Sequence, residues 1–290
     1  MAECSVCPRS CNIDRALKKG FCGCGENIRI AKYMAHFGEE PCITGTKGSG
    51  AVFFSGCNLR CVFCQNRVIS RGHKGEDISG EKLEKIFFEL KSMGVHNINL
   101  VTATHFIPQV AEVLRKCKEK IGLPVVYNCG GYESVESLKM LEGLVDIYLP
   151  DLKYYSAELS EKYSSCPDYF NKASAAVKEM LRQQPENVFE KDIMQKGAII
   201  RHLVLPNCYK DSIKIFEWLY ENFREKLPII SVMRQYFPNL SPDEAEKYPA
   251  LNRKLTTFEY RKVVDRCAEL GFEGFTQEKG CDNSDMTPDF

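Results

Sequence analysis

Ala51-Val-Phe-Phe-Ser-Gly-Cys57-Asn-Leu-Arg-Cys61-Val-Phe-Cys64 is the most informative stretch of this chain. Three cysteines follow a short apolar run at the spacing C-x3-C-x2-C, and an aromatic residue, Phe63, precedes the last of them. Thiolates are soft ligands that favour iron–sulfur clusters, zinc or copper(I). A cubane cluster usually takes four cysteines, so a loop with three leaves one iron open to chelate and act on a small molecule. The loop therefore predicts a catalytic cluster rather than an electron carrier.

The composition predicts one large globular domain with a small appendage. The chain has 290 residues, of which 44% are hydrophobic and 27% charged, and its formal net charge is zero. This balance gives no reason to expect a nucleic acid or a membrane as a partner. No apolar stretch of the sequence is long enough to span a bilayer, and Met1-Ala-Glu-Cys4 lacks the basic and apolar regions of a secretory signal. We therefore expect a cytoplasmic protein.

Fifteen cysteines are many for a cytoplasmic protein, and we interpret them as ligands because the cytosol keeps thiols reduced. Four near the N-terminus can supply thiolates to a second metal, either zinc or an auxiliary iron–sulfur cluster: Cys4, Cys7, Cys11 and Cys22. The sequence does not decide between these metals, or whether Cys24 or Cys42 takes part. Glu39 and Glu40, beside Cys42, are expected in a solvated loop.

Six apolar, strand-like runs follow residue 50 and alternate with helical patterns. The runs span residues 51–55, 97–102, 124–128, 145–149, 198–205 and 229–233. This alternation predicts an α/β domain over 51–290, with a parallel sheet and right-handed crossovers. It does not separate an open sheet from a partial barrel, but in both cases ligands bind at the carboxyl ends of the strands. Residues 1–50 are interpreted as a Cys-rich metal-binding extension.

Helix signals lie between and after these runs. Leu83, Ile86, Phe87 and Leu90 repeat at helical spacing, and an apolar stripe over 135–144 predicts another helix. Thr256-Thr-Phe-Glu259 is typical of a capping box that opens a last helix. Residues 236–255 contain three prolines and are predicted to be an irregular loop.

The cysteine loop, with its spacing and Phe63, resembles that of the radical S-adenosylmethionine (SAM) superfamily. Three motifs resemble pyruvate formate-lyase activating enzymes: Phe53-Phe-Ser-Gly-Cys-Asn-Leu-Arg-Cys61, Asp151-Leu-Lys153 and Arg201-His-Leu-Val-Leu-Pro206. Three others resemble an uncharacterised subgroup related to those activases: Cys7-Pro-Arg-Ser-Cys11, Glu39-Glu-Pro-Cys-Ile43 and Asn97-Ile-Asn-Leu-Val-Thr102. The resemblance covers nearly the whole chain and implies a partial (β/α)6 barrel similar to a TIM barrel.

The resemblance also implies the cofactors and the reaction. Cys57, Cys61 and Cys64 would hold a [4Fe-4S] cluster whose fourth iron chelates SAM. One electron from the reduced cluster would then cleave SAM to methionine and a 5′-deoxyadenosyl radical, which abstracts a hydrogen atom from the substrate. The protein orients the cofactor and excludes competing reactions.

Several residues acquire cofactor-binding roles from the same resemblance. Phe63 would lie against the adenine or shield the cluster, and Asp151 would accept hydrogen bonds from the ribose. Lys153 would pair with the SAM carboxylate, and His202 would approach the adenosine. From the residues alone, Asp151 and Lys153 could also form a surface ion pair. His202 could be a hydrogen-bonded core histidine, with Arg201 on the opposite side of its strand.

The chain departs from the superfamily after the second strand. Most members have Gly-Gly-Glu there, which holds the SAM amino group, whereas this chain has Thr102-Ala-Thr-His105. Thr102, Thr104 or His105 could replace that acceptor, and Asn128 at the next strand end could add a polar contact.

The leading functional hypothesis is an anaerobic activase that installs a glycyl radical on a partner enzyme, with flavodoxin or ferredoxin as electron donor. A second hypothesis keeps the radical chemistry but directs it at a small molecule, a peptide or an RNA base. A third is a non-catalytic iron–sulfur or zinc protein.

Overall fold

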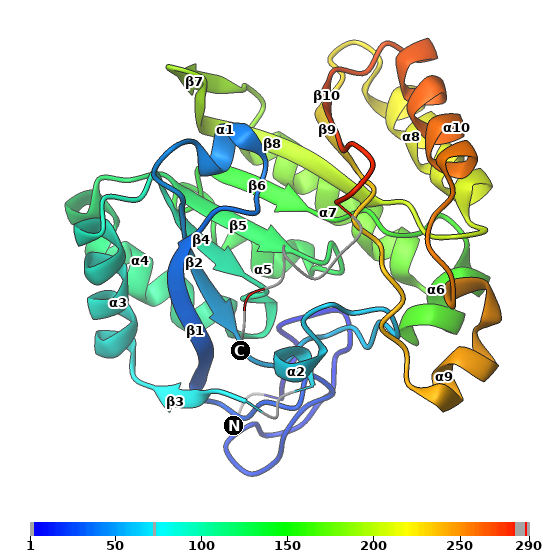
Figure 1. Ribbon diagram of the computed structural model, residues 1–290. Helices are drawn as coiled ribbons and strands as arrows, with labels where there is room; N and C mark the ends of the chain where they lie inside the picture. The colour runs from blue at the N-terminus through cyan, green and yellow to red at the C-terminus, as the bar shows by residue number, and fades with distance from the viewer. Residues whose placement is uncertain (1–2, 72–73, 282–287, 289–290) are drawn as a thin grey trace.

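Seven parallel strands form the centre of the computed structural model, which describes residues 3–71, 74–281 and 288 (Figure 1). In spatial order they are β10 (Gly274–Thr276), β9 (Ile229–Met233), β8 (Ile193–Leu203), β6 (Ile147–Pro150), β5 (Val125–Cys129), β4 (Ile98–Val101) and β2 (Ser49–Phe54). The six predicted runs correspond to β2, β4, β5, β6, β8 and β9, so the predicted α/β partial barrel is confirmed. The seventh strand, β10, has only three residues and is too short to leave a recognisable pattern.

The predicted extension contributes a strand to the same sheet. β1 (Ile28–His36) pairs antiparallel with β2, and β3 (Glu76–Ile78) pairs antiparallel with β1. Only Ile28 and Ile30 of β1 are fully buried, which explains why the segment shows little apolar alternation. A short β7 (Val188–Glu190) pairs with the beginning of β8. The division of the chain at residue 50 remains a prediction.

Helices cover the outer face of the sheet. The longer ones are α3 (Gly80–Ser92), α4 (Ile107–Ile121), α6 (Ala157–Ser164), α7 (Tyr169–Gln183), α8 (Tyr209–Phe223) and α10 (Thr257–Glu269). The stripe predicted over 135–144 is helical only in α5 (Val135–Lys139). Among the described residues, none of the helices is both long and apolar enough to cross a lipid bilayer.

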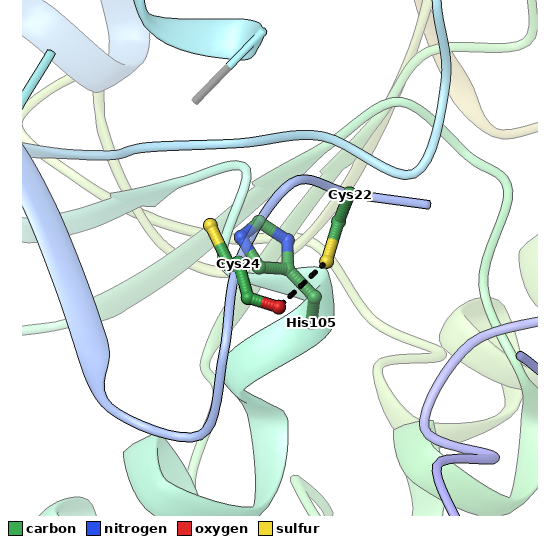
Figure 2. Close-up of side chains that lie close together, drawn as sticks. All are labelled: Cys22, Cys24 and His105. Carbon is green, nitrogen blue, oxygen red and sulfur yellow. Dashed lines mark hydrogen bonds between the residues drawn. The ribbon is translucent and has the colours of Figure 1, made fainter. Parts of the chain in front are cut away.

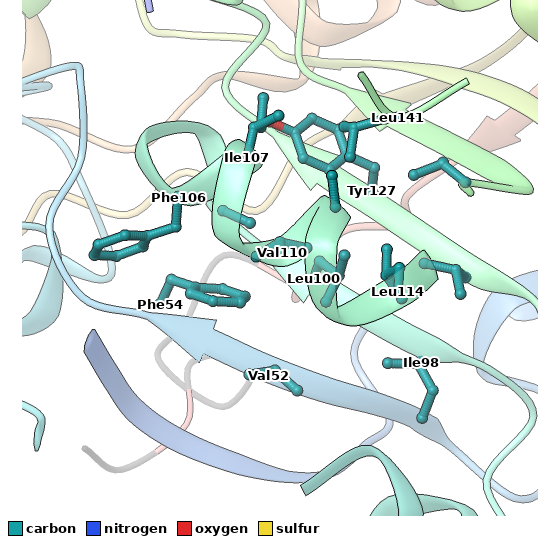
Figure 3. Close-up of a cluster of buried hydrophobic side chains, with 14 of the residues drawn as sticks. Val52, Phe54, Ile98, Leu100, Phe106, Ile107, Val110, Leu114, Tyr127 and Leu141 are labelled. Carbon is teal, nitrogen blue, oxygen red and sulfur yellow. The ribbon is translucent and has the colours of Figure 1, made fainter. Parts of the chain in front are cut away.

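The core lies between strands β2, β4 and β5 and the helices outside them (Figure 3). Val52 and Leu100 point from the sheet towards Val110 and Leu114 of α4, and all four side chains are completely buried. Successive side chains of a strand point to opposite faces of the sheet. The residues of β4 and β5 that alternate with these outward-facing side chains therefore point into the barrel. Asn99 and Asn128 are two such inward residues.

The prediction of an irregular loop over residues 236–255 is wrong in part. The segment contains α9 (Pro242–Lys247) and a 3-10 turn, η2 (Pro249–Leu251). Ser241 and Glu244 form a capping box, and proline is compatible with the first turn of a helix because the amide there needs no partner. Pro242 and Pro249 therefore mark helix starts, whereas Pro238 lies in an irregular stretch, as predicted.

The predicted capping box at Thr256 is present and should stabilise the fold in a pH-dependent way. The Glu259 carboxylate accepts hydrogen bonds from Arg253 and from the Thr256 amide, and these interactions lower its pKa to about 2. Since this folded-state pKa lies below the ordinary value, the stabilisation is complete above about pH 4.5 and is lost as the pH falls towards 2.

Glu259→Gln should therefore lower the free energy of unfolding by about 1–2 kcal/mol at pH 7, and by much less at pH 3. Urea titrations at the two pH values measure the difference. Glu112→Gln is the control, because the Glu112–Lys116 pair is exposed on both sides and should contribute little. An equal effect of Glu259→Gln at both pH values would contradict the expectation.

Candidate active site

The cysteine loop begins at the carboxyl end of β2 and lies at the mouth of the barrel, followed by α2 (Arg67–Ser70). The three sulfur atoms have different neighbours. Ser164 Oγ donates to Cys61 Sγ at 2.9 Å, the Leu59 amide donates to Cys57 Sγ at 3.4 Å, and Cys64 Sγ lies 3.5 Å from Ser70 Oγ. Removal from water raises the pKa of both Cys57 and Cys61, so neither thiol ionises readily without a cation.

A buried chain of charges lies beside this loop. Lys153 Nζ is 2.5 Å from Asp151 Oδ2, and Arg201 Nε is 2.9 Å from Asp151 Oδ1. Burial alone would raise the pKa of Asp151, but the charges of Lys153 and Arg201 outweigh it and hold that pKa below its usual value. The Lys153 ammonium also favours the thiolate of Cys61. The network thus connects the cysteine loop to the ends of β6 and β8.

Glu39 extends this network into the barrel, which sequence reasoning missed. Its Oε2 lies 2.9 Å from Arg201 Nη1, and its Oε1 accepts from the amides of Asn99 and Asn128 at 3.0 Å each. Arg201 also donates to Asn128 Oδ1. The expectation of a solvated loop for Glu39 and its neighbour is therefore wrong, because inward side chains of three strands pair with this carboxylate.

Two further residues of the same motif are also buried. Glu40 is only 8% exposed, and burial raises its pKa. Cys42, in the short α1 (Pro41–Thr44), packs among apolar side chains such as Ile43 and Val126. Burial raises the pKa of Cys42 to about 12, as expected for a thiol that packs as a small hydrophobe.

Phe63 and Thr102 also lie at the mouth. Phe63 is buried and contacts Tyr154 and Tyr236 edge-on, with ring centroids 6.4 Å apart in each case. Thr102 has a φ of +63° and donates its amide to the Asn128 carbonyl at 2.8 Å. A β-branched residue rarely adopts this conformation, and such strain is common where a strand end forms a binding site.

Three other predicted cofactor-binding residues, Thr104, His202 and His105, have hydrogen-bond partners within the protein. Thr104 Oγ1 donates to Glu133 Oε1 at 2.8 Å. His202 makes hydrogen bonds at both ring nitrogens, to the Leu152 carbonyl and to Ser212 Oγ on α8. Its side chain faces the helices, while that of Arg201 faces the barrel, and this geometry favours the core interpretation of His202. His105 lies beside the N-terminal extension, and burial lowers its pKa to about 4, which keeps it neutral.

The extension packs against the cysteine loop, as the blue trace in Figure 1 shows. Arg9 Nε donates to the Asn58 carbonyl at 2.8 Å, and the Cys57 amide donates to the Cys22 carbonyl at 3.3 Å. Cys7 and Cys22 are buried, whereas Cys4 and Cys11 are half-buried. The predicted role of these four cysteines as ligands remains a prediction.

The donor set at the mouth fits the cofactors that the sequence predicts. The three thiols have different hydrogen-bond neighbours, so each could bind a different iron atom of a cluster. The Lys153 ammonium near Cys61 would compensate the negative charge of a thiolate-bound cluster. Asp151 and Lys153 provide an acceptor and a donor for a zwitterionic ligand. Arg201 and Glu39 are the residues that sequence reasoning did not assign to the site. The sequence places Arg201 and His202 on opposite faces of one strand, which indicates that one of them faces the barrel, but it does not show which one.

Comparison with known proteins agrees with this geometry. The sequence model of the Radical SAM superfamily matches residues 51–222, more than half of the chain. The uncharacterized protein MJ0674 of Methanocaldococcus jannaschii is 29% identical over 273 residues, which cover 91% of this chain and 73% of that protein.

Two solved structures share the fold. A radical SAM methyltransferase from Sphaerobacter thermophilus has a TM-score of 0.55 at 11% identity, covering 80% of this chain and 67% of that one. Streptococcus suis SuiB, bound to its precursor peptide SuiA, has a TM-score of 0.52 at 15% identity, covering 78% of this chain and 47% of SuiB. The chain thus spans about half the length of SuiB. With the matched residues, the three-cysteine loop and the partial barrel taken together, this chain belongs to the radical SAM superfamily.

Proposed function

We propose that this enzyme cleaves SAM reductively and abstracts a hydrogen atom from a backbone glycine of a partner protein. The observation that carries the radical chemistry is the position of Cys61 beside Lys153, which is itself paired with Asp151 at the same mouth. The activase motifs around Cys57, Asp151 and Arg201 support a protein glycine as the target. Flavodoxin or ferredoxin would supply the electron under anaerobic conditions.

Each residue at the mouth has a specific task in this proposal. Cys57, Cys61 and Cys64 would hold the [4Fe-4S] cluster. An ammonium has three N–H donors, and Asp151 takes one from Lys153, which leaves donors for the SAM carboxylate. Asp151 keeps its charge at neutral pH and accepts from the ribose hydroxyls. With the cluster and SAM bound, the chemistry supplied is one-electron cleavage to methionine and a 5′-deoxyadenosyl radical.

Phe63 completes the mouth. Its ring, held by Tyr154 and Tyr236, presents an apolar surface next to the last cysteine. Such a surface suits a planar adenine and excludes water from the reacting atoms, which limits quenching of a radical. The network from Lys153 to Glu39 keeps these groups in place without ligand, so less ordering is needed when SAM binds.

Anaerobic reconstitution with iron and sulfide, followed by reduction and SAM addition, tests the proposal in two steps. We expect stoichiometric 5′-deoxyadenosine and methionine, measured by chromatography. With the co-purified partner present, we expect a protein-centred radical in the electron paramagnetic resonance spectrum, with a splitting that collapses when the partner contains deuterated glycine.

The two steps separate the reaction from its target. An intact cluster that yields no 5′-deoxyadenosine would refute the radical chemistry. 5′-Deoxyadenosine with its abstracted hydrogen traced to a small molecule, a peptide or an RNA would refute the glycine target and support the corresponding substrate class.

A further inference from the structure

Cys22, Cys24 and His105 converge on one point, although they come from two distant parts of the chain. The two cysteines belong to the extension, and His105 lies in the 3-10 turn η1 (Thr104–Phe106) after β4. One ligand atom from each residue lies within 4.8 Å of the other two, and all three residues are buried. In Figure 2 the imidazole lies between the two sulfur atoms.

We propose that Cys22, Cys24 and His105 bind a single zinc ion that joins the extension to the barrel. Two thiolates and one imidazole are typical zinc ligands, and a single ion needs ligand atoms that converge, as these do. The set shares Cys22 with the four cysteines predicted from sequence, and it adds Cys24, whose part was left open, and a histidine that was one of three candidates to hold the SAM amino group. Zinc binding at this site requires no radical chemistry, so this proposal can be tested independently of the proposed function.

The hydrogen bonds of His105 prepare one nitrogen for a metal. Nε2 lies 2.8 Å from the Ser55 carbonyl oxygen, and because a carbonyl only accepts, Nε2 carries the proton. Nδ1 of the neutral ring is then an acceptor, and it is buried with no hydrogen-bond partner among the described residues. A buried acceptor without a partner is costly. A metal-binding histidine commonly donates its other N–H to a backbone carbonyl, which is the arrangement found here.

The surroundings of the sulfur atoms also suit a cation with two thiolates. The Cys24 thiol donates to the same Ser55 carbonyl oxygen at 3.2 Å, a hydrogen bond that a metal-bound thiolate would give up. Arg15 donates to the carbonyls of His105 and Gly25, which ties the two halves of the site together. Its positive charge favours both thiolates, whereas the neighbouring Cys22 and burial raise the pKa of Cys24.

The site lies directly against the residue before the first cluster cysteine. Gly56 has a φ of +83°, and a Cβ there would come within 2.5 Å of Cys24 Sγ and 3.2 Å of His105 Nε2. The Cys57 amide donates a hydrogen bond to the Cys22 carbonyl. The ion would therefore fix the start of the cysteine loop. Three protein ligands leave a fourth position. Cys11 is a candidate for it, because a Cβ placed on Gly20 would lie 3.5 Å from Cys11 Sγ and 3.6 Å from Cys22 Sγ.

Zinc content and the extended fine structure beyond the zinc X-ray absorption edge of the full chain, purified with its iron–sulfur cluster, test the site. We expect about one zinc per chain, with sulfur ligands at about 2.3 Å and a nitrogen ligand at about 2.0 Å. His105→Gln and Cys24→Ser should each lose this zinc while iron content is retained. His202→Gln and Cys166→Ser are matched controls, since both replace buried residues away from the site, and both should keep the zinc.

The absorption edge of the unmodified protein keeps the proposal testable even if a variant fails to fold. An all-sulfur shell, iron or copper in place of zinc, or a chain that binds no added zinc would overturn it. Loss of zinc in Cys4→Ser and Cys7→Ser but not in His105→Gln would also overturn it and favour the four-cysteine set.

Discussion

Cys61→Ala should abolish reductive cleavage of SAM. Cys61 is the central cysteine of the loop, and its sulfur faces Ser164 and the ammonium of Lys153. Without it, one iron loses its thiolate, and the two remaining cysteines cannot hold three irons of a cubane. We expect iron and sulfide content to fall, the broad visible absorption of the thiolate-bound cluster to weaken, and 5′-deoxyadenosine to fall below detection.

Cys117→Ala is the matched control for this experiment. Cys117 is completely buried in α4, where its thiol donates to the Val113 carbonyl one turn earlier. Loss of one buried sulfur there should cost about 1 kcal/mol of stability and leave cleavage unchanged. If Cys61→Ala retained normal cleavage, or if Cys117→Ala lost it to the same extent, the assignment of the cluster to the loop would be wrong.

The fold was largely predictable because its strands are buried on both faces. Such strands appear as continuous apolar runs, and six of the seven parallel strands were found in this way. β1 was not predicted because it lies near the edge of the sheet, where most of its residues are half-buried and leave no continuous apolar run. The segment 236–255 was misread because proline at a helix start looks, from sequence alone, the same as proline in a loop.

The site was less predictable because its contacts span long stretches of chain. Glu39 meets Asn99, Asn128 and Arg201, which lie 60, 89 and 162 residues further along. No local pattern records such pairings. A two-residue period places Arg201 and His202 on opposite faces, but only the finished sheet shows that Arg201 points inward.

His105 illustrates the same limit in another way. Its position in the sequence, at the end of the second predicted strand, suggested a contact with SAM. The 3-10 turn that follows β4 places the side chain beside Cys22 and Cys24, a neighbourhood that the sequence does not indicate. Residues at strand ends share an edge of the sheet, but the local turn decides which way each side chain points.

Arg201→Met should destabilise the protein strongly, by about 3–5 kcal/mol, because it leaves buried carboxylates without their shared cation. Arg201 is 12% exposed and bridges Asp151 and Glu39, whose side chains are 16% and 8% exposed. Arg266→Met is the control, since Arg266 and its partners Glu217 and Glu269 are all exposed by a third or more. That change should cost about 0–1 kcal/mol. Urea unfolding under anaerobic conditions measures both.

The pH dependence of Arg201→Met and a second substitution distinguish the loss of the Arg201 charge from the loss of its packing contacts. Arg201 helps to hold the pKa of Asp151 below its usual value, so ionised Asp151 stabilises the fold above its unfolded pKa and this contribution disappears as the pH falls through the folded pKa. In Arg201→Met the folded pKa rises, and acid destabilisation should begin at a higher pH. Adding Glu39→Gln removes one orphaned charge and should recover about 1–3 kcal/mol. Strictly additive effects of the two changes would mean that Glu39 and Arg201 pack together without electrostatic coupling.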